Sequence, residues 1–215
     1  MNVPMSVQPQ PMNAANPVVF VDLAFSLRGA AVPLDHGYPL FAALSRVVPR
    51  LHEETGWGVH PIHGNRTAPG RLELLETSRV KLRIPAAEIA ALLPLAGATL
   101  DVAGAALHLG APTVLALRPG PDLLARIVII KGASEPGPVR EHALRQLAAI
   151  PGVPHDVALE VGPRRVLRVG EHTVVGFQLA VTGLDTAASL AVQCRGLGGR
   201  RHMGAGLFVP PGRRR

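Results

Sequence analysis

This chain of 215 residues is poor in cysteine, lysine and aromatic side chains. Its single cysteine, Cys194, excludes an internal disulfide and a cysteine-rich zinc site, and the apolar run around it predicts a buried thiol. Aromatic residues make up 3% of the sequence, and Tyr38 and Trp57 are the only tyrosine and tryptophan. Stacking of bases on aromatic side chains therefore cannot dominate any binding of nucleic acid.

Long apolar runs are also absent. Because no stretch reaches the roughly 18 uncharged apolar residues that a spanning helix needs, the sequence predicts no membrane segment. Residues 1–17 contain neither a basic region nor an apolar region, so they do not resemble a signal peptide, and we expect a disordered tail. The simplest expected location is the cytoplasm.

The charge is strongly positive and is carried almost wholly by arginine. Lysine and arginine number 22 against 15 acidic residues, which gives a formal charge of +7, and Lys81 and Lys131 are the only lysines. A balance of this kind favours polyanionic partners such as RNA, DNA or an anionic membrane. A genome rich in arginine codons would also raise this number, so charge alone does not select among them.

The hydrophobic pattern of the first half predicts the order β-α-β-β-α-β. Strand patterns cover 18–27, 58–64, 71–85 and 99–110, and helical patterns run from Asp35 or His36 to about Glu54 and over 86–98. Pro49 stands inside the first helical pattern, so we expect a kink there.

The second half repeats this order. Strand patterns cover 123–132, 157–169, 172–182 and 207–209, and helical patterns cover 136–150 and 185–194. Asp185 is expected to cap the last helix. The fold class predicted is α+β with two tandem ferredoxin-like domains, over 18–118 and 122–210, followed by a basic tail at 211–215.

Nine histidines raise the question of a metal site, but their spacing does not support one. His60 and His63 fall on opposite faces of a strand, and no paired cysteines or acidic cluster accompany them. We therefore predict no metal and no other cofactor. The glycine cluster near the end follows a helix, which is the wrong context for a nucleotide-binding fingerprint.

Proton transfer by histidine is the remaining chemistry. His36 and His52 bracket the first helical pattern, and a continuous helix would separate them by roughly 24 Å, so only one can serve a single centre. His52 lies at the carboxyl end, where the helix dipole stabilises an imidazolium. Steps of seven residues back from His52 reach Ser45 and Tyr38, on nearly the same face. The ordinary alternative is a solvated histidine at a fraying helix end.

The stretch GLGGRRHMGAGLFVP, residues 196–210, combines glycines with basic side chains. The glycines let the backbone approach another molecule closely. Arg200 and Arg201 carry forked donors that suit phosphate, and His202 follows them. The ordinary alternative is a loose glycine turn beside a sheet edge.

These segments carry a family resemblance. The run VPLDHGYPLFAALSRVVPRLHEETGWGVHPIHG (32–64) resembles the start of the CRISPR-associated endoribonucleases that cut precursor CRISPR RNA within its repeats. The glycine-rich stretch is similar to the signature of the RAMP superfamily to which they belong. The DHGY opening and the short length resemble the myxan-type subgroup.

The resemblance implies cleavage without metal, by attack of the RNA 2′-hydroxyl on the adjacent phosphate, with a 2′,3′-cyclic phosphate and a 5′-hydroxyl as products. His52 matches the family's histidine at the end of the first helix. The tyrosine or lysine that family members often carry two turns earlier is missing, which leaves Ser45 as the second candidate. His36 matches a further family position and stays a third catalytic candidate, although its main expected role is to anchor its loop or to contact RNA.

The expected partners are the stem-loop of the CRISPR repeat RNA, which the enzyme would retain as product, and other subunits of an effector complex. The residues expected to contact RNA are Arg46, Arg50, Arg140, Arg145, Arg164, Arg165, Arg168, Gly198, Gly199, Arg200, Arg201 and His202. The nearest rival is a repeat-binding subunit that does not cleave. A ferredoxin-like RNA-recognition module is more distant, because it needs aromatic residues on its sheet.

Overall fold

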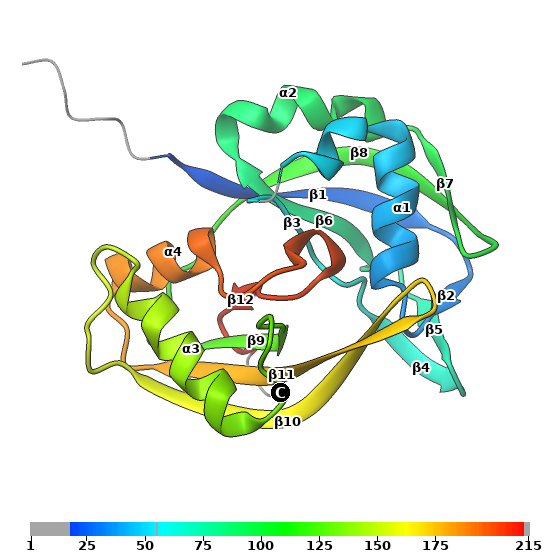
Figure 1. The fold of residues 1–215 in the computed structure, drawn as a ribbon. Coiled ribbons are helices and arrows are strands. Elements are labelled where there is room, and N and C mark those ends of the chain that lie inside the picture. The colour runs from blue at the N-terminus through cyan, green and yellow to red at the C-terminus, as the bar shows by residue number, and fades with distance from the viewer. Residues whose placement is uncertain (1–17, 55, 213–215) are drawn as a thin grey trace, which may run out of the picture.

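The computed structural model of the chain describes residues 18–54 and 56–212, and within them each half forms its own antiparallel sheet (Figure 1). The first sheet has the order β3 (Gly58–Val59), β6 (Arg79–Pro85), β1 (Phe20–Arg28), β8 (Ala105–Ala116) and β7 (Thr99–Val102). The second has the order β10 (Ala158–Val169), β11 (His172–Thr182), β9 (Leu123–Val128) and β12 (Phe208–Val209).

Both halves have the element order and the strand order of a ferredoxin-like fold. In the second half, β9 is followed by α3 (Pro136–Ala148), then β10 and β11, then α4 (Thr186–Arg195) and β12. The first strand lies between the third and the fourth, and the second strand is at the edge. The first half has the same order in β1, β3, β6 and β8, with β7 added beside β8. The predicted α+β class with two ferredoxin-like units is confirmed.

The expected boundary at 117–122 falls between the last strand of the first sheet and the first strand of the second. The expected N-terminal tail, 1–17, lies outside the described residues, as do residues 213–215 of the expected basic tail. Pro211 and Gly212, the described part of that tail, are exposed.

The first half contains a small third sheet that the hydrophobic pattern does not predict. It has the order β2 (Ala31–Pro33), β5 (Arg71–Leu74) and β4 (Gly64–Ala68). The single strand predicted over 71–85 was therefore wrong, because a turn closed by Ser78 separates β5 from β6. The strand predicted over 58–64 was wrong for a similar reason: β3 ends before Pro61, which has no backbone N–H to donate.

Two other predictions differ in their boundaries. The strand pattern over 99–110 is a hairpin, because Ala103 and Gly104 both adopt positive φ between β7 and β8. The helical pattern over 86–98 is a chain of short turns. These turns are η2 (Ala86–Glu88), α2 (Ile89–Leu92) and η3 (Leu93–Leu95), with Pro94 in the last.

The first helical pattern is broken where Pro49 predicted a kink. The α-helix α1 (Gly37–Val47) ends at Val48, whose φ of −127° and ψ of 85° leave the helical region. A 3₁₀ helix, η1 (Pro49–His52), follows with proline in its first turn. Leu40, Phe41 and Leu44 bury one side of α1.

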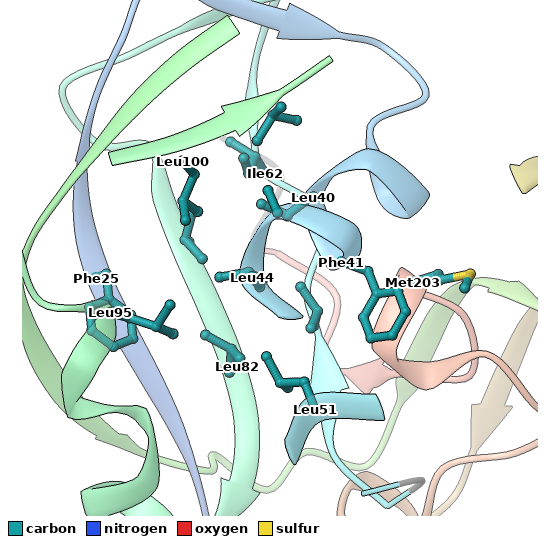
Figure 2. Packing of buried hydrophobic residues seen from close by; sticks show 14 of the residues in the cluster. Phe25, Leu40, Phe41, Leu44, Leu51, Ile62, Leu82, Leu95, Leu100 and Met203 are labelled. Carbon is teal, nitrogen blue, oxygen red and sulfur yellow. The ribbon is translucent and has the colours of Figure 1, made fainter. Parts of the chain in front are cut away.

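The hydrophobic core beneath α1 is shared between the two halves. Figure 2 shows Leu40, Leu44 and Leu82 packed together, with Phe41 extending from α1 beside Met203. The same cluster includes residues from the second half: Ile127, Ile129, Leu167, Met203 and Ala205. A second cluster fills the space between the second sheet and α3 and α4. The shared core places the C-terminal segment against α1.

A buried arginine also joins the halves. Arg83 on β6 is 1% exposed and donates from Nε and Nη2 to the two carboxylate oxygens of Asp22, at 2.8 and 3.2 Å. Its Nη1 donates to the carbonyl oxygens of Gln193 and Phe208, at 3.2 and 2.7 Å. One guanidinium therefore connects β1 of the first sheet with α4 and β12 of the second.

Candidate active site and nucleic-acid interface

His52 is the exposed candidate among the predicted catalytic residues. It is the last residue of η1, and the neighbouring Leu51 is buried in the core, so the turn directs His52 outward. Its imidazole lies edge-on to the ring of Phe41, with centroids 4.8 Å apart and planes at 68°. A ring supported in this way on a buried aromatic side chain remains accessible to a substrate from its other side.

His202 reaches the same aromatic ring from the other half of the chain. It lies in η4 (Arg201–Met203), is half-buried, and its ring centroid is 4.3 Å from that of Phe41. Burial lowers the pKa of His202, and the nearby charges of Arg200 and His52 lower it further. The structure thus brings together His52 and His202, which are 150 positions apart in sequence.

His36 lies at the other end of α1 and is 4% exposed. Its Nδ1 bonds the carbonyl oxygen of Pro33 at 2.9 Å, and its Nε2 accepts the backbone N–H of Ile62 at 2.9 Å. This pattern requires a neutral ring protonated on Nδ1. Burial lowers the pKa of His36 and favours the same neutral form. Both nitrogens are occupied, so the geometry supports the anchoring role rather than proton transfer to a substrate.

Ser45, the second predicted catalytic residue, is also enclosed. It is buried on α1, and its hydroxyl has no hydrogen-bond partner among the residues that the structure describes. Tyr38, one step of seven earlier, is 36% exposed. The break at Val48 also ends the helical face that these residues would share with His52. The placement of Ser45 therefore gives no support to a catalytic role.

Two arginines near His52 already have protein partners. Arg50 forms ion pairs with Glu54 at 3.0 Å and Glu88 at 2.8 Å, and its guanidinium lies 5.5 Å from the centroid of the Trp57 ring. Arg46 donates to the carbonyl oxygen of Asp101 at 2.9 Å. Both side chains remain exposed, but the positive charge of Arg50 is balanced by carboxylates.

Arg201 requires a correction, because the expectation that it meets phosphate assumed a solvent-facing guanidinium. Arg201 is 5% exposed, and its Nη1 donates to the carbonyl oxygen of Arg195. Burial and the neighbouring charge of Arg83 lower its pKa to about 10. Arg200, by contrast, is half-buried and adopts a left-handed backbone with φ of 62°. Of this pair, Arg200 is the side chain with access to solvent.

Several glycines of the C-terminal stretch are required by the backbone conformation and by close packing within the protein. Gly198 has φ of +69°, and a Cβ there would meet the carbonyl oxygen of Ile129 on the adjoining edge of the second half. Gly206 has φ of +67°, and its Cβ would meet the carbonyl oxygen of Leu197. The loop is thus packed closely against backbone atoms, and a Cβ at Gly204 would meet the ring of Pro61 in the first half.

Gly199 differs from its neighbours. It is exposed, its N–H donates to Ile129 at 2.9 Å, and a Cβ would meet no atom within 4 Å. A pocket of about 900 Å³ lies beside it, and its lining includes Arg195, Arg200 and His202. This part of the loop is the part open to another molecule.

The other predicted contact residues lie on two exposed elements. Arg140 and Arg145 are exposed on α3, and Arg164, Arg165 and Arg168 are exposed on β10. β10 and β11, predicted as strands over 157–169 and 172–182, form a long hairpin. Arg165 donates to the side-chain oxygen of Gln178 at 3.3 Å, a neutral partner that leaves its charge uncompensated. Near it, Arg126 on β9 adds a positive charge that the sequence analysis missed.

The sequence analysis also missed the role of Phe41. Its spacing with Leu40 and Leu44 marks it as a core residue, and nothing in that pattern indicates that it supports two histidines. Within residues 18–54 and 56–212, no group of three His, Cys, Asp or Glu side chains is placed to hold a metal ion. Across the same ranges, every helix is too short or too polar to cross a membrane.

Comparison with known proteins places the chain in a family. Residues 21–213 match the Cas6 Crispr family. A CRISPR-associated endonuclease Cas6 from Myxococcus xanthus (strain DK1622) is 48% identical over 200 residues, which cover 92% of this chain and 84% of that protein. This relative agrees with the myxan-type resemblance.

Solved structures with little sequence similarity share the fold. A CRISPR associated protein Cas6 has a TM-score of 0.64 at 13% identity and covers 90% of this chain and 100% of its own. A Cas6-related protein from Pyrococcus furiosus has a TM-score of 0.63 at 11% identity, and covers 91% and 100%. These structures show the fold, and the matched family model with the 48% identical relative shows that the chain belongs to the Cas6 family of CRISPR proteins.

Proposed function

We propose that the chain is a metal-independent endoribonuclease that cuts precursor CRISPR RNA within the repeat stem-loop. The observation that carries this proposal is an exposed His52, held on Phe41 at the domain junction, in a chain 48% identical to a CRISPR-associated endonuclease Cas6. Imidazole transfers protons near neutral pH without a metal, and each such transfer contributes about 10²–10⁴-fold to rate.

The reaction uses the RNA itself as nucleophile. The 2′-oxygen loses its proton and forms a bond to the adjacent phosphorus, while the bond from phosphorus to the 5′-oxygen breaks. The 5′-oxygen then takes up a proton. The products are a 2′,3′-cyclic phosphate and a 5′-hydroxyl. His52 is accessible for one of these two proton transfers.

The proposed RNA surface is the set of exposed arginines on the second half together with the open part of the glycine loop. Arg164, Arg165 and Arg168 on the β10–β11 hairpin would grip the base of the repeat stem, and Arg140 and Arg145 on α3 would follow its phosphates. Arg200 and the exposed backbone of Gly199 would contact the strand near the cut. Arginine forks suit phosphate oxygens, which supports this placement.

The proposal extends to product retention and partners. A basic surface of this kind favours slow release of the cleaved stem-loop, so we propose that the enzyme keeps its product and passes it to other subunits of an effector complex. Because the substrate is a transcript, we propose the cytoplasm as the place of action. A repeat-binding subunit without cleavage is the rival function.

The test is incubation of the purified chain with its own repeat RNA in excess EDTA, followed by analysis of both new ends. Cleavage at one bond, with a cyclic phosphate and a 5′-hydroxyl, supports the proposal. A control RNA with a 2′-deoxynucleotide before the cut should remain intact. Cleavage that appears only with magnesium or manganese contradicts the mechanism, and tight binding without cleavage favours the rival.

A further inference from the structure

The aromatic ring of Phe41 contacts two histidines, one from each half of the chain. The imidazole of His52 lies 4.8 Å from the ring centroid of Phe41, and that of His202 lies 4.3 Å from it. The separation between the centroids of the two imidazoles therefore cannot exceed the sum of these two distances.

The segment that carries His202 is held firmly. Arg200 and Gly204 flank η4 with left-handed backbones, at φ of 62° and 85°. Met203 is buried in the shared core beside Phe41, as Figure 2 shows. The N–H of Gly206 donates to Ile127 at 2.8 Å, which fixes the far side of the turn to the second sheet. His202 is thus presented from a packed turn rather than from a loose loop.

Cleavage by a 2′-hydroxyl needs two proton transfers on opposite sides of one phosphorus atom. Each transferring nitrogen must come within about 2.6–3.2 Å of its oxygen. Two imidazoles that contact one aromatic ring from different elements offer nitrogens for these two transfers. The enclosed hydroxyl of Ser45 and the occupied nitrogens of His36 are not available for them.

We propose that His202 is the second catalytic residue: it takes the proton from the 2′-hydroxyl while His52 protonates the leaving 5′-oxygen. This inference rests on the proposed function. In the forward step the O2′–P bond forms and the P–O5′ bond breaks, and one proton moves from the 2′-oxygen to His202. A second proton moves from His52 to the 5′-oxygen. Proton exchange with water then restores both rings.

The surroundings of the two rings support this division of roles. A base must be neutral before it acts, and the burial of His202, together with the positive charge of Arg200 beside it, favours its neutral ring. His52 is the more exposed of the two rings, and the proposal gives it the role of acid. Arg200 lines the same pocket as His202, and its charge would balance the negative charge that develops on the phosphorane.

The test compares His202→Ala and His52→Ala in single-turnover cleavage of two RNAs. One RNA is the normal repeat, and the other has sulfur in place of the leaving 5′-oxygen at the cut. A thiolate leaves without protonation, so the sulfur substrate removes the need for an acid but not for a base.

We expect both variants to cut the normal RNA at least about 100-fold more slowly than the wild type. The sulfur substrate should restore the rate of His52→Ala to within about tenfold of wild type, and should leave His202→Ala slow. Added imidazole should partly restore His202→Ala. Affinity for RNA and the denaturation midpoint check that each variant is folded, and His202→Gln provides a second, bulkier replacement.

An unchanged rate for folded His202→Ala or His202→Gln overturns the inference. Rescue of His202→Ala by sulfur also overturns it, because that residue would then be the acid. These outcomes are distinct from failure of the proposed function, in which the wild type would bind the normal RNA without cutting it.

Discussion

The two ring nitrogens of His36 form hydrogen bonds with the backbone of Pro33 and Ile62. We therefore expect substitution of His36 to change stability rather than the chemical step. In His36→Ala, the buried N–H of Ile62 and the carbonyl of Pro33 lose their partner. Each unsatisfied group costs about 1–3 kcal/mol, so we expect a clearly lower free energy of unfolding. The rate of cleavage per folded molecule, at saturating RNA, should change less than tenfold.

His36 should also make the free energy of unfolding depend on pH, and the direction of this dependence can be derived. Burial lowers the pKa of His36 in the folded state, so the unfolded chain binds this proton more readily. Its stabilising contribution is complete above the unfolded pKa of about 6.5 and is lost as pH falls toward the lowered value. Urea unfolding between pH 5 and 8 should therefore be less pH-dependent in His36→Ala. An equally steep dependence would mean that other groups cause it, such as His63, whose pKa is also lowered.

For single residues, the sequence predicted which side chains have functional or capping roles, but it did not predict which side chains are buried. It identified His52 at a helix end and Asp185 as a cap, which the bond from the N–H of Ala188 at 2.7 Å confirms. It could not show that Arg201 and Ser45 are enclosed, because their burial depends on contacts that form only after the two halves meet. The same dependence hid the contact of His202 with Phe41.

Among the elements, the C-terminal glycine loop gives a matched pair of substitutions. Gly206→Ala places a side chain at φ of +67° and against the carbonyl oxygen of Leu197. We expect a loss of at least about 1–2 kcal/mol in stability from the left-handed conformation, together with slower cleavage because η4 shifts. Gly199→Ala, in the same loop, meets no atom within 4 Å and has no positive φ, so it should be as stable as the wild type. Equal denaturation midpoints for the two variants would contradict this account of the loop.

The β10–β11 hairpin gives a test of RNA contact. Among the described residues, the side-chain partner of Arg165 is the neutral Gln178, so on binding Arg165 would release a counterion from the RNA. Arg165→Gln should weaken affinity and reduce the salt slope by about one. Arg50→Gln is the matched control, because Glu54 and Glu88 already neutralise Arg50, and it should change the slope less. Titrations of repeat RNA at several salt concentrations measure both. An unchanged slope in Arg165→Gln would remove this part of the hairpin from the interface.

Element types were predicted better than element ends. The long strands β10 and β11 and the helix α3 agree with their predicted types, and α3 buries Val139, Ala143 and Leu147 on one face. Residues 58–85 could not be predicted in this way. There a proline, a serine-closed turn and the bond from Ile62 to His36 redirect the chain into a separate small sheet.

For the whole molecule, Arg83 is a buried polar connection between the halves. Arg83→Met leaves Asp22 buried with only Lys81 and His60, and also leaves the carbonyls of Gln193 and Phe208 without this donor. Removing one partner of a buried ion pair costs about 3 kcal/mol or more. We expect urea unfolding to show this loss, and cleavage to fall because α4 and β12 are no longer held against the first sheet.

The control for this change is Arg71→Met, the same substitution at an exposed arginine on β5. It should leave both stability and cleavage nearly unchanged. If Arg83→Met unfolds at the same denaturant concentration as Arg71→Met, the guanidinium of Arg83 does not join the two halves in the way that its four hydrogen bonds indicate.

The central claim is that this Cas6-family protein cuts RNA by proton transfer from a histidine at the domain junction. Its most direct test is single-turnover cleavage of the repeat RNA in EDTA by the wild type, His52→Ala and His155→Ala, a control at an exposed histidine of the second half. We expect His52→Ala to bind RNA with nearly unchanged affinity and to cut at least about 100-fold more slowly, whereas His155→Ala should match the wild type. A His52→Ala variant that cuts at the wild-type rate would contradict the account.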